Sequence, residues 1–271
     1  MSFELFIATR YLRAKRRQAV IGIITAISIA GVTAGVASLI IALAINNGFR
    51  QDLQNRLLGS TSHVQLLRVE SDGIRDWQPL LQRLQKQPHV AAASPAIYEQ
   101  VLVSRGARAK GAILKGILPE YERKVSDMLK NGTVGSAAAL EPNALEGERA
   151  PSSSPDSLAA VQQRVAAMPP IVLGKEMADD LGATVGSVVM VISPQGELTP
   201  FGLVPKYARF KVTGIFNSGF FDYDSSWAFI RLADAQQLFA LGDLVSVIEF
   251  KIGDIYQAGQ IGAELQRAAG P

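Results

Sequence analysis

The sequence has no cysteine among its 271 residues, and it has only two histidines. Without cysteine the chain forms neither a disulfide nor a thiolate nucleophile, so its stability depends on packing. His63 and His89 stand apart from any acid or nucleophile that would complete a catalytic cluster. The G-x-S-x-G, H-E-x-x-H and Walker A patterns are also missing. We therefore expect no enzyme, no catalytic residue, no metal site and no cofactor in this chain.

Two short motifs resemble parts of ligand sites. Gly174-Lys175 lacks the upstream glycine that a phosphate-binding loop needs. The segment Asp222–Ser226 offers oxygen ligands, but the rest of a calcium loop is missing. We interpret this segment as a turn.

Charge is absent from Ala19 to Ile45, a run of 27 residues. At about 1.5 Å per residue, a helix of this length exceeds the roughly 30 Å hydrocarbon core, so the run predicts a transmembrane helix. Five basic residues precede the run and few follow it, which places the N-terminus in the cytoplasm. They are Arg10, Arg13, Lys15, Arg16 and Arg17. The alternative is a signal peptide cleaved near Ala42–Ala44, but its apolar region is usually about 7–15 residues long.

The residues beside and within this span indicate further contacts. Phe3, Phe6 and Ile7 fall on one side of a short helix, which predicts an amphipathic helix on the inner membrane surface. Gly31 and Gly35 belong to a ladder of small residues that lets a second membrane helix approach closely. Such ladders are also common in any alanine-rich span, so this helix-packing role is a hypothesis.

The part of the chain beyond the span is nearly neutral. Residues 1–18 carry a net charge of +4, whereas the whole chain carries +3. A nucleic-acid partner needs a basic surface, so we expect none. About 225 residues remain beyond the span, enough for one large or two small domains with their own cores.

The apolar pattern of this remaining part predicts an α+β fold of mixed sheets with packed helices. A helical stalk is expected first, followed by a strand, a helix and two strands. These elements are expected at residues 46–62, His63–Val69, Trp77 to Leu84, Ile97–Ser104 and Ala112–Ile117. Later strands are expected at Ser187–Ile192, Ala208–Phe216, Ala228–Arg231 and Val245–Ile252, and later helices at Gly174–Leu181, Ala233–Ala240 and Tyr256–Ala269.

Residues 135–170 interrupt this pattern. They are rich in proline, serine, alanine and glutamate and poor in large apolar residues. Such a composition predicts a mobile insert, with a short helix at Ser157–Ala167.

The segment that joins two of the later strands is the most informative one outside the membrane. Pro200 and Pro205 enclose Phe201, Leu203 and Val204. Because proline lacks the N–H of a sheet ladder and has a fixed φ, we expect both prolines to end the strand pairing. The result is a stiff, protruding apolar tip, which loses little entropy when a partner binds it. The alternative is that Phe201 folds back onto the core.

Several runs together resemble the permease subunits of the lipoprotein-releasing (Lol) ABC transporters, within the mechanotransmission, macrolide-exporter-like superfamily. The resemblance covers nearly the whole chain except the insert, and its specificity lies in the combination. The runs are Arg10–Arg13, Asn46–Phe49, Gly116–Pro119, Ile171–Glu176, Thr199–Lys206, Gly214–Phe216 and Tyr223–Phe229.

The resemblance implies a bacterial inner-membrane protein whose periplasmic domain has two lobes, one inserted in the other. The implied parts are a cytoplasmic amphipathic helix (1–18), a transmembrane helix (19–45), a stalk (46–62), lobe 1 (63–134), the insert (135–170), lobe 2 (171–244) and a return to lobe 1 (245–271). Family members have further membrane helices, so we expect this chain to be the N-terminal part of a permease.

The resemblance also implies partners. A separate cytoplasmic ATPase subunit binds the ATP, and a second permease subunit completes a homo- or heterodimer. Lipoprotein cargo leaves the membrane lipid for a periplasmic carrier, which a hook hairpin at residues 194–209 grips. The hook tip comprises Thr199, Pro200, Phe201, Gly202, Leu203, Val204 and Pro205. Lys206 and Arg209 would form a polar pad that meets acidic or carbonyl groups of the carrier.

Two other functions stay open. An efflux permease of the macrolide or toxin type shares the architecture but lacks a hook bounded by prolines. A single-span periplasmic adaptor would match a chain that ends at Pro271. A signalling receptor is disfavoured because only 18 residues precede the span.

Overall fold

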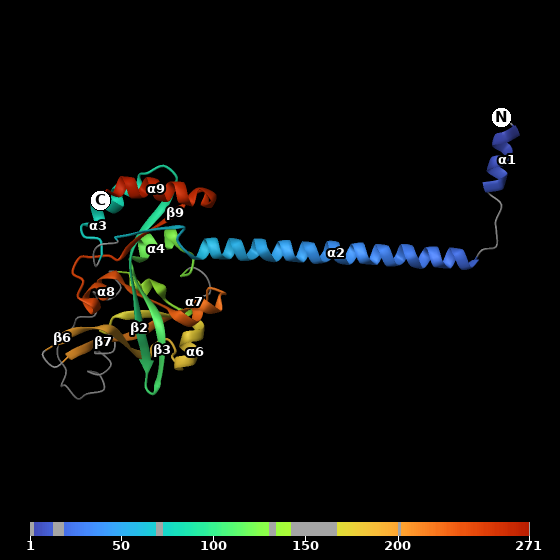
Figure 1. Ribbon diagram of the computed structural model, residues 1–271. Coiled ribbons are helices and arrows are strands. Elements are labelled where there is room, and N and C mark those ends of the chain that lie inside the picture. Colours follow the sequence, from blue (N-terminus) through green and yellow to red (C-terminus); the bar gives the residue numbers. More distant parts are fainter. Residues whose placement is uncertain are drawn as a thin grey trace. The chain divides into compact units, whose positions relative to one another are not determined.

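The computed structural model describes residues 3–12, 19–68, 73–129, 134–141, 167–199 and 202–270. The chain divides into two compact units after Arg56. The first unit contains α1 (Phe3–Leu12) and most of α2 (Ala19–Ser60). The second contains the strands and the remaining helices (Figure 1).

Helix α2 is 42 residues long, about 63 Å at 1.5 Å per residue. Its large apolar side chains are exposed from Val20 to Phe49 on all sides, a pattern that suits lipid better than water. The stretch Val20–Asp52 is long and apolar enough to cross a membrane. A Cβ built at Gly31 or Gly35 meets nothing within 4 Å, so the packing of a second helix there stays a prediction.

The described part of the second unit is built on a nine-stranded sheet. Its strands are β1 (Val64–Leu67), β2 (Val90–Arg105), β3 (Arg108–Ile117), β4 (Val134–Gly135), β5 (Pro170–Gly174), β6 (Val188–Thr199), β7 (Gly202–Phe216), β8 (Trp227–Arg231) and β9 (Val247–Ile252). They pair in the order β1-β9-β2-β3-β8-β5-β7-β4, and β6 pairs with both β2 and β7. Because β6 links β7 back to β2, six strands (β2, β3, β8, β5, β7 and β6) close into a ring.

The alternation of side chains along each strand gives this ring an inner and an outer core. Leu114, Phe210 and Ile230 are fully buried members of the large inner cluster. Phe229, the neighbour of Ile230, belongs to a second cluster together with Phe216, and the two rings meet edge to face at 5.1 Å. The strands therefore carry apolar residues on both faces, as buried strands do.

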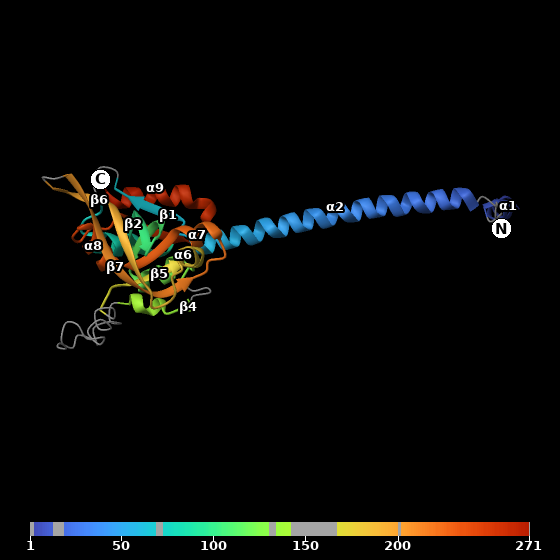
Figure 2. The same cartoon turned by 90° about the horizontal axis from the view of Figure 1, so that it is seen from below.

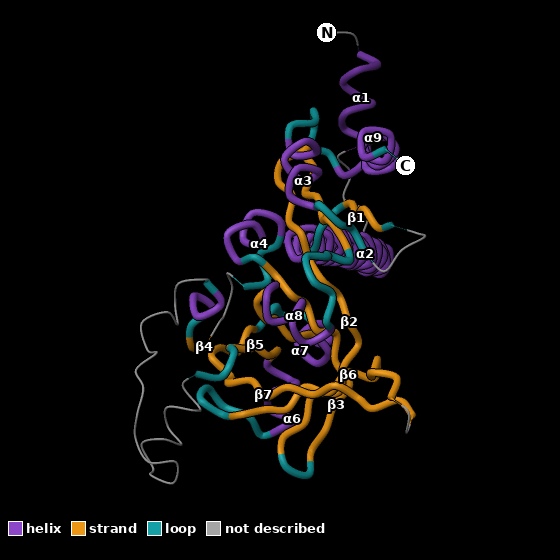
Figure 3. Tube along the Cα trace, turned by 90° about the vertical axis from the view of Figure 1, so that its left-hand side faces the viewer, coloured by secondary structure: helices purple, strands orange, loops and turns teal. Residues whose placement is uncertain are grey.

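Helices cover the sheet at its β1–β9–β2 end and pack against both hydrophobic clusters. They are α3 (Trp77–Gln85), α4 (Pro119–Val125), η1 (Ala137–Leu140), α6 (Lys175–Leu181), α7 (Phe221–Ser226), α8 (Leu232–Phe239), η2 (Ile255–Gln257) and α9 (Ala258–Ala269). Figures 1 and 3 show α3 and α9 near each other at this end. Helix α3 buries Trp77, Leu81 and Leu84, the spacing that its sequence predicts, while α9 buries Ile261 and Leu265.

The predicted α+β class is confirmed, but one local interpretation is wrong. Asp222–Ser226 belongs to helix α7 and is not a turn. The backbone N–H of Asp224 donates to the carbonyl of Phe220, and the Asp224 carboxylate accepts from the N–H of Ser218 at 2.8 Å. The carboxylate thus holds the start of a helix and offers no free ligand.

The expected lobe boundaries stay predictions, because one sheet runs through both ranges. Strand β3 of residues 63–134 pairs with β8 of residues 171–244. Strand β9 of residues 245–271 returns to β1 and β2, the course expected for that segment. The predicted helix Ser157–Ala167 lies almost wholly outside the described residues.

Candidate functional site

The β6–β7 hairpin extends beyond the ring of strands, and Figures 2 and 3 show its outer end projecting from the second unit. Its inner part pairs from Val188↔Lys211 to Ser193↔Lys206. Its outer part pairs from Glu197↔Val204 to Thr199↔Gly202. A hairpin therefore lies where the sequence predicts the hook.

The expectation that both prolines end the pairing is wrong for Pro205. The ladder is irregular between Ser193 and Glu197, opposite Pro205, and then resumes. A bulge in the facing strand accommodates a proline. The residues of the bulge are unpaired, so the N–H that proline lacks is not needed for a ladder hydrogen bond at that position. Pro200 and Phe201 lie outside the described residues, so the apolar character of the tip stays a prediction.

The expected pad residues line a cavity of about 590 Å³ between β7 and α8. Lys206 is half-buried and Arg209 is exposed, since residues three apart on a strand face opposite sides. Asp234 lines the same cavity; burial raises its pKa, although the Arg231 guanidinium at 2.7 Å opposes this shift. Within this cavity, Arg209 is thus an exposed cation beside a partly buried carboxyl group.

A second cavity, of about 520 Å³, lies on the outer face of β2, β3 and β6 at the base of the hairpin. Its lining is apolar apart from Gln100 and Ser226. Leu102 of β2 lines it and leaves 40% of its surface exposed. Pro205 lines both cavities, so the base of the hairpin lies between an apolar hollow and one whose lining includes charged residues.

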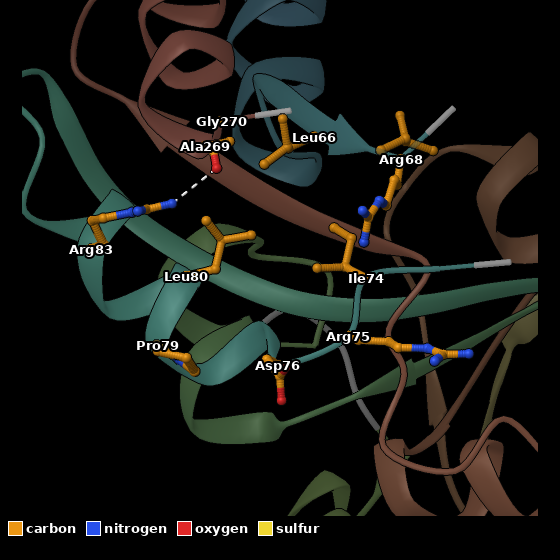
Figure 4. A pocket seen from close by; sticks show the side chains of 11 residues that line it. Leu66, Arg68, Ile74, Arg75, Asp76, Pro79, Leu80, Arg83, Ala269 and Gly270 are labelled. Atoms are coloured by element: carbon orange, nitrogen blue, oxygen red, sulfur yellow. Dashed lines mark hydrogen bonds between the residues drawn. The ribbon is translucent and has the colours of Figure 1, made fainter. Parts of the chain in front are cut away.

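A third cavity, of about 460 Å³, lies among β1, α3 and the end of α9 (Figure 4). Arg68, Arg75 and Arg83 line it around an apolar floor that includes Leu80. Arg83 donates to the carbonyl of Ala269 at 2.9 Å, whereas Figure 4 shows Arg75 pointing away from the other two. The guanidinium groups do not converge on one point, so this cavity has no focused anion site.

Three charged side chains are buried together where β1, β3, β9 and α4 meet. The Lys115 ammonium lies 2.5 Å from Glu122 and 2.7 Å from Glu249, and each of the three side chains is at most 4% exposed. Glu249 also accepts from the Tyr98 hydroxyl at 2.7 Å and from the Ser62 hydroxyl at 2.9 Å. Ser62 follows the last residue of α2 by two positions, so this charged cluster holds the start of β1.

The pKa values of the two carboxyl groups are shifted in opposite directions. For Glu122, burial outweighs the attraction of Lys115 and raises the pKa. For Glu249, burial also acts upward, but the Lys115 charge and the hydrogen bonds together lower the pKa. Burial disfavours the charge on Lys115, yet the two carboxylates more than compensate and raise its pKa. Lys115 therefore lies between two carboxyl groups and pairs with both.

Sequence reasoning missed this charged cluster and the two hollows beside the hairpin. A signal for the cluster was present, because Lys115 and Glu249 interrupt apolar runs that predict buried strands. The apolar hollow has no local signal, since three strands contribute to it.

His63 contacts the backbone of β9. The Nδ1 atom of His63 lies 3.3 Å from the backbone N–H donor of Ile252, which is a structural contact. No group of three or more histidine, aspartate or glutamate side chains that would hold a metal occurs in the described ranges.

The chain belongs to the family described as the MacB-like periplasmic core domain, which matches residues 25–268. More particularly, it resembles lipoprotein-releasing system transmembrane proteins, which confirms the resemblance seen in its sequence. LolC of Neisseria meningitidis serogroup B is 32% identical over 97% of this chain and 58% of the relative. LolC of Xylella fastidiosa strain Temecula1 is 33% identical over 98% of this chain and 58% of the relative. LolE of Haemophilus influenzae is 29% identical over 95% and 57%.

The chain thus spans a little over half the length of these relatives. Among solved structures, the extracellular domain of the noncanonic ABC-type transporter YknZ from Gram-positive bacteria has a TM-score of 0.42 and 12% identity, covering 75% of this chain and 89% of that one. The periplasmic region of MacB from Actinobacillus actinomycetemcomitans has a TM-score of 0.41 and 14% identity, with 77% of each chain covered.

Proposed function

We propose that this chain belongs to the permease of an ABC transporter that releases lipoproteins from the inner membrane to a soluble periplasmic carrier. Helix α2 anchors it, with the N-terminus in the cytoplasm and the second unit in the periplasm. A separate subunit binds and hydrolyses ATP, and a second permease subunit completes the transporter. The chain performs no bond chemistry; its work is conformational.

One observation carries this proposal: the β6–β7 hairpin protrudes in a chain that resembles lipoprotein-releasing transmembrane proteins along almost its whole length. The ladder of the hairpin resumes beyond Pro205, so its outer part is held by backbone hydrogen bonds. A preformed hairpin loses less entropy on binding than a loose loop does. We assign it the capture of the carrier.

The hook in this proposal comprises Leu203 and Val204 with the neighbouring tip residues. Arg209, exposed beside the hairpin base, is the pad residue that meets acidic or carbonyl groups of the carrier. Lys206 is half-buried and contributes less. Charged contacts at the rim of an interface act mainly on the association rate, whereas apolar anchors at its centre act on dissociation.

The test replaces Leu203 with aspartate in the full chain and measures the binding of the purified carrier by surface plasmon resonance. A charged side chain at an apolar anchor should cost at least about 2 kcal/mol, or roughly thirtyfold in Kd. Leu67→Asp is the matched control, because Leu67 is 58% exposed on β1 and outside the hairpin. Its Kd should equal that of the unchanged chain.

Equal binding by Leu203→Asp and Leu67→Asp would reject the hook. Absence of any carrier binding by the unchanged chain would instead favour the efflux permease, which hands no lipoprotein to a soluble carrier.

A further inference from the structure

The apolar hollow at the base of the hairpin is lined mainly by apolar side chains of adjacent strands. Leu102, Ile113 and Ile192 are partly exposed on the outer face of three adjacent strands, and Pro194 and Pro205 close its side. No charged residue is among the described side chains that line it. A cavity of about 520 Å³ falls within the range of small-molecule sites. A ligand that suits it is therefore apolar and uncharged.

We propose that this hollow receives an acyl chain of the lipoprotein cargo during its transfer to the carrier. The proposal rests on the function proposed above, which supplies a lipid-bearing cargo beside the hairpin. A peptide is a poorer occupant, because its backbone N–H and C=O groups need partners and, among the described side chains of the lining, only those of Gln100 and Ser226 offer them. An acyl chain has no polar group to leave unpaired. Each buried CH₂ group strengthens binding roughly fourfold.

The strand geometry places the hollow where a transferred chain would pass. The β6–β7 ladder is irregular between Ser193 and Glu197, on the same side as Pro194. Pro205, opposite this irregular stretch, lines the hollow and belongs to the hairpin that captures the carrier. An acyl chain held here lies next to the carrier without crossing open water.

Gly111 makes the proposal testable without disturbing the core. It lines the hollow opposite Leu102, and a Cβ built there meets nothing within 4 Å. Gly111→Leu therefore fills the hollow from its floor. Gly253→Leu is the matched control, because a Cβ at Gly253 also has open space and Gly253 lies outside the hollow.

The experiment uses the full chain in phosphatidylcholine nanodiscs and a triacylated lipopeptide with a photoreactive diazirine in one acyl chain. Peptide mass spectrometry locates the labelled residues after irradiation, with α2 as the internal reference. We expect label on β2 around Leu102, reduced about tenfold by Gly111→Leu and unchanged by Gly253→Leu. Label confined to α2, or equal label in both variants, overturns the proposal.

Two further arms keep the result decisive. If Gly111→Leu misfolds by near-ultraviolet circular dichroism, Leu102→Glu places a charge in the hollow and should reduce the label as strongly, with Leu67→Glu as its control. A phosphatidylcholine probe with the same diazirine chain tests the source of the acyl group. Label on β2 as strong as that from the lipopeptide overturns the assignment to cargo.

Carrier binding by the unchanged chain separates the two proposals. Label on β2 without carrier binding rejects the proposed function and leaves an acyl site. Carrier binding without label on β2 rejects only the acyl site.

Discussion

At one end of the β2–β3 pair charged side chains are buried, and at the other end apolar side chains are exposed. Toward β9, the charged residues Lys115, Glu122 and Glu249 are buried and paired with one another. Toward the hairpin, Leu102 and Pro205 are apolar and exposed. A buried charge is costly unless it is paired, whereas an exposed apolar side chain does not disturb the packing of the core. The first end therefore holds the fold, whereas the second leaves surface for partners.

The comparison teaches where the chain tolerates change. Ser62 and Gln65, which follow α2, both donate to Glu249, so the charged cluster anchors the first strand of the second unit. Substitutions at the charged cluster should change stability, and substitutions at the hairpin end should change binding.

The largest effect is expected for Lys115→Met. It leaves two buried carboxyl groups without their counter-charge, and breaking such a pair costs about 3–5 kcal/mol. The measurement is the free energy of unfolding, from urea titration of the chain in detergent followed by near-ultraviolet circular dichroism.

Lys110→Met is the control for this change. Lys110 pairs with Asp180 at the surface, where their side chains are 28% and 59% exposed. Removing an exposed pair costs about 0–1 kcal/mol. If both variants lose the same free energy, the charged cluster does not hold the fold and the comparison fails.

The next effect concerns two glycines, of which Gly174 is buried and Gly111 is exposed. A Cβ at Gly174, between β5 and α6, would lie 2.2 Å from the backbone oxygen of Asp224. Gly174→Ala should therefore cost about 1–3 kcal/mol of stability through overpacking. Gly111→Ala meets nothing within 4 Å and should stay within about 0.5 kcal/mol of the unchanged chain. Equal melting temperatures for the two variants would contradict this contrast.

The sequence predicts the local elements well because their signals are local. The spacing of Trp77, Leu81 and Leu84 predicts the buried face of α3, and α3 buries these residues. The uncharged run from Ala19 to Ile45 lies within α2. The position of the hairpin follows from two strands separated by a proline-rich segment.

The closure of the ring could not be predicted, because it depends on distant pairings. β2 pairs with β9 over its first part and with both β3 and β6 over its later part, and Leu102 pairs with Ile192, 90 positions later. The apolar hollow exists only because these strands come together. The resumption of pairing past Pro205 was also missed, since a bulge in the partner strand compensates for a proline and leaves no mark in the local sequence.

The smallest expected effect is a change in the pH dependence of stability, which tests whether burial raises the pKa of Glu122. Its pKa is raised above 4.5 by burial, with Lys115 offsetting part of the shift. A carboxyl group with a raised pKa contributes stability below its ordinary pKa and loses that contribution as the pH rises through the raised value. Glu122→Gln does not titrate, so it should gain stability relative to the unchanged chain as the pH rises from about 4 toward neutrality.

Urea midpoints at a series of pH values measure this difference. Glu120→Gln is the control, because Glu120 is exposed on the same helix. The lowered pKa of Glu249 acts in the opposite direction, since its contribution is lost on acidification, and both proteins share it. Parallel curves for Glu122→Gln and the unchanged chain would show that Lys115 fully compensates for burial. Glu122 would then be ionised like Glu249, and both would pair with Lys115.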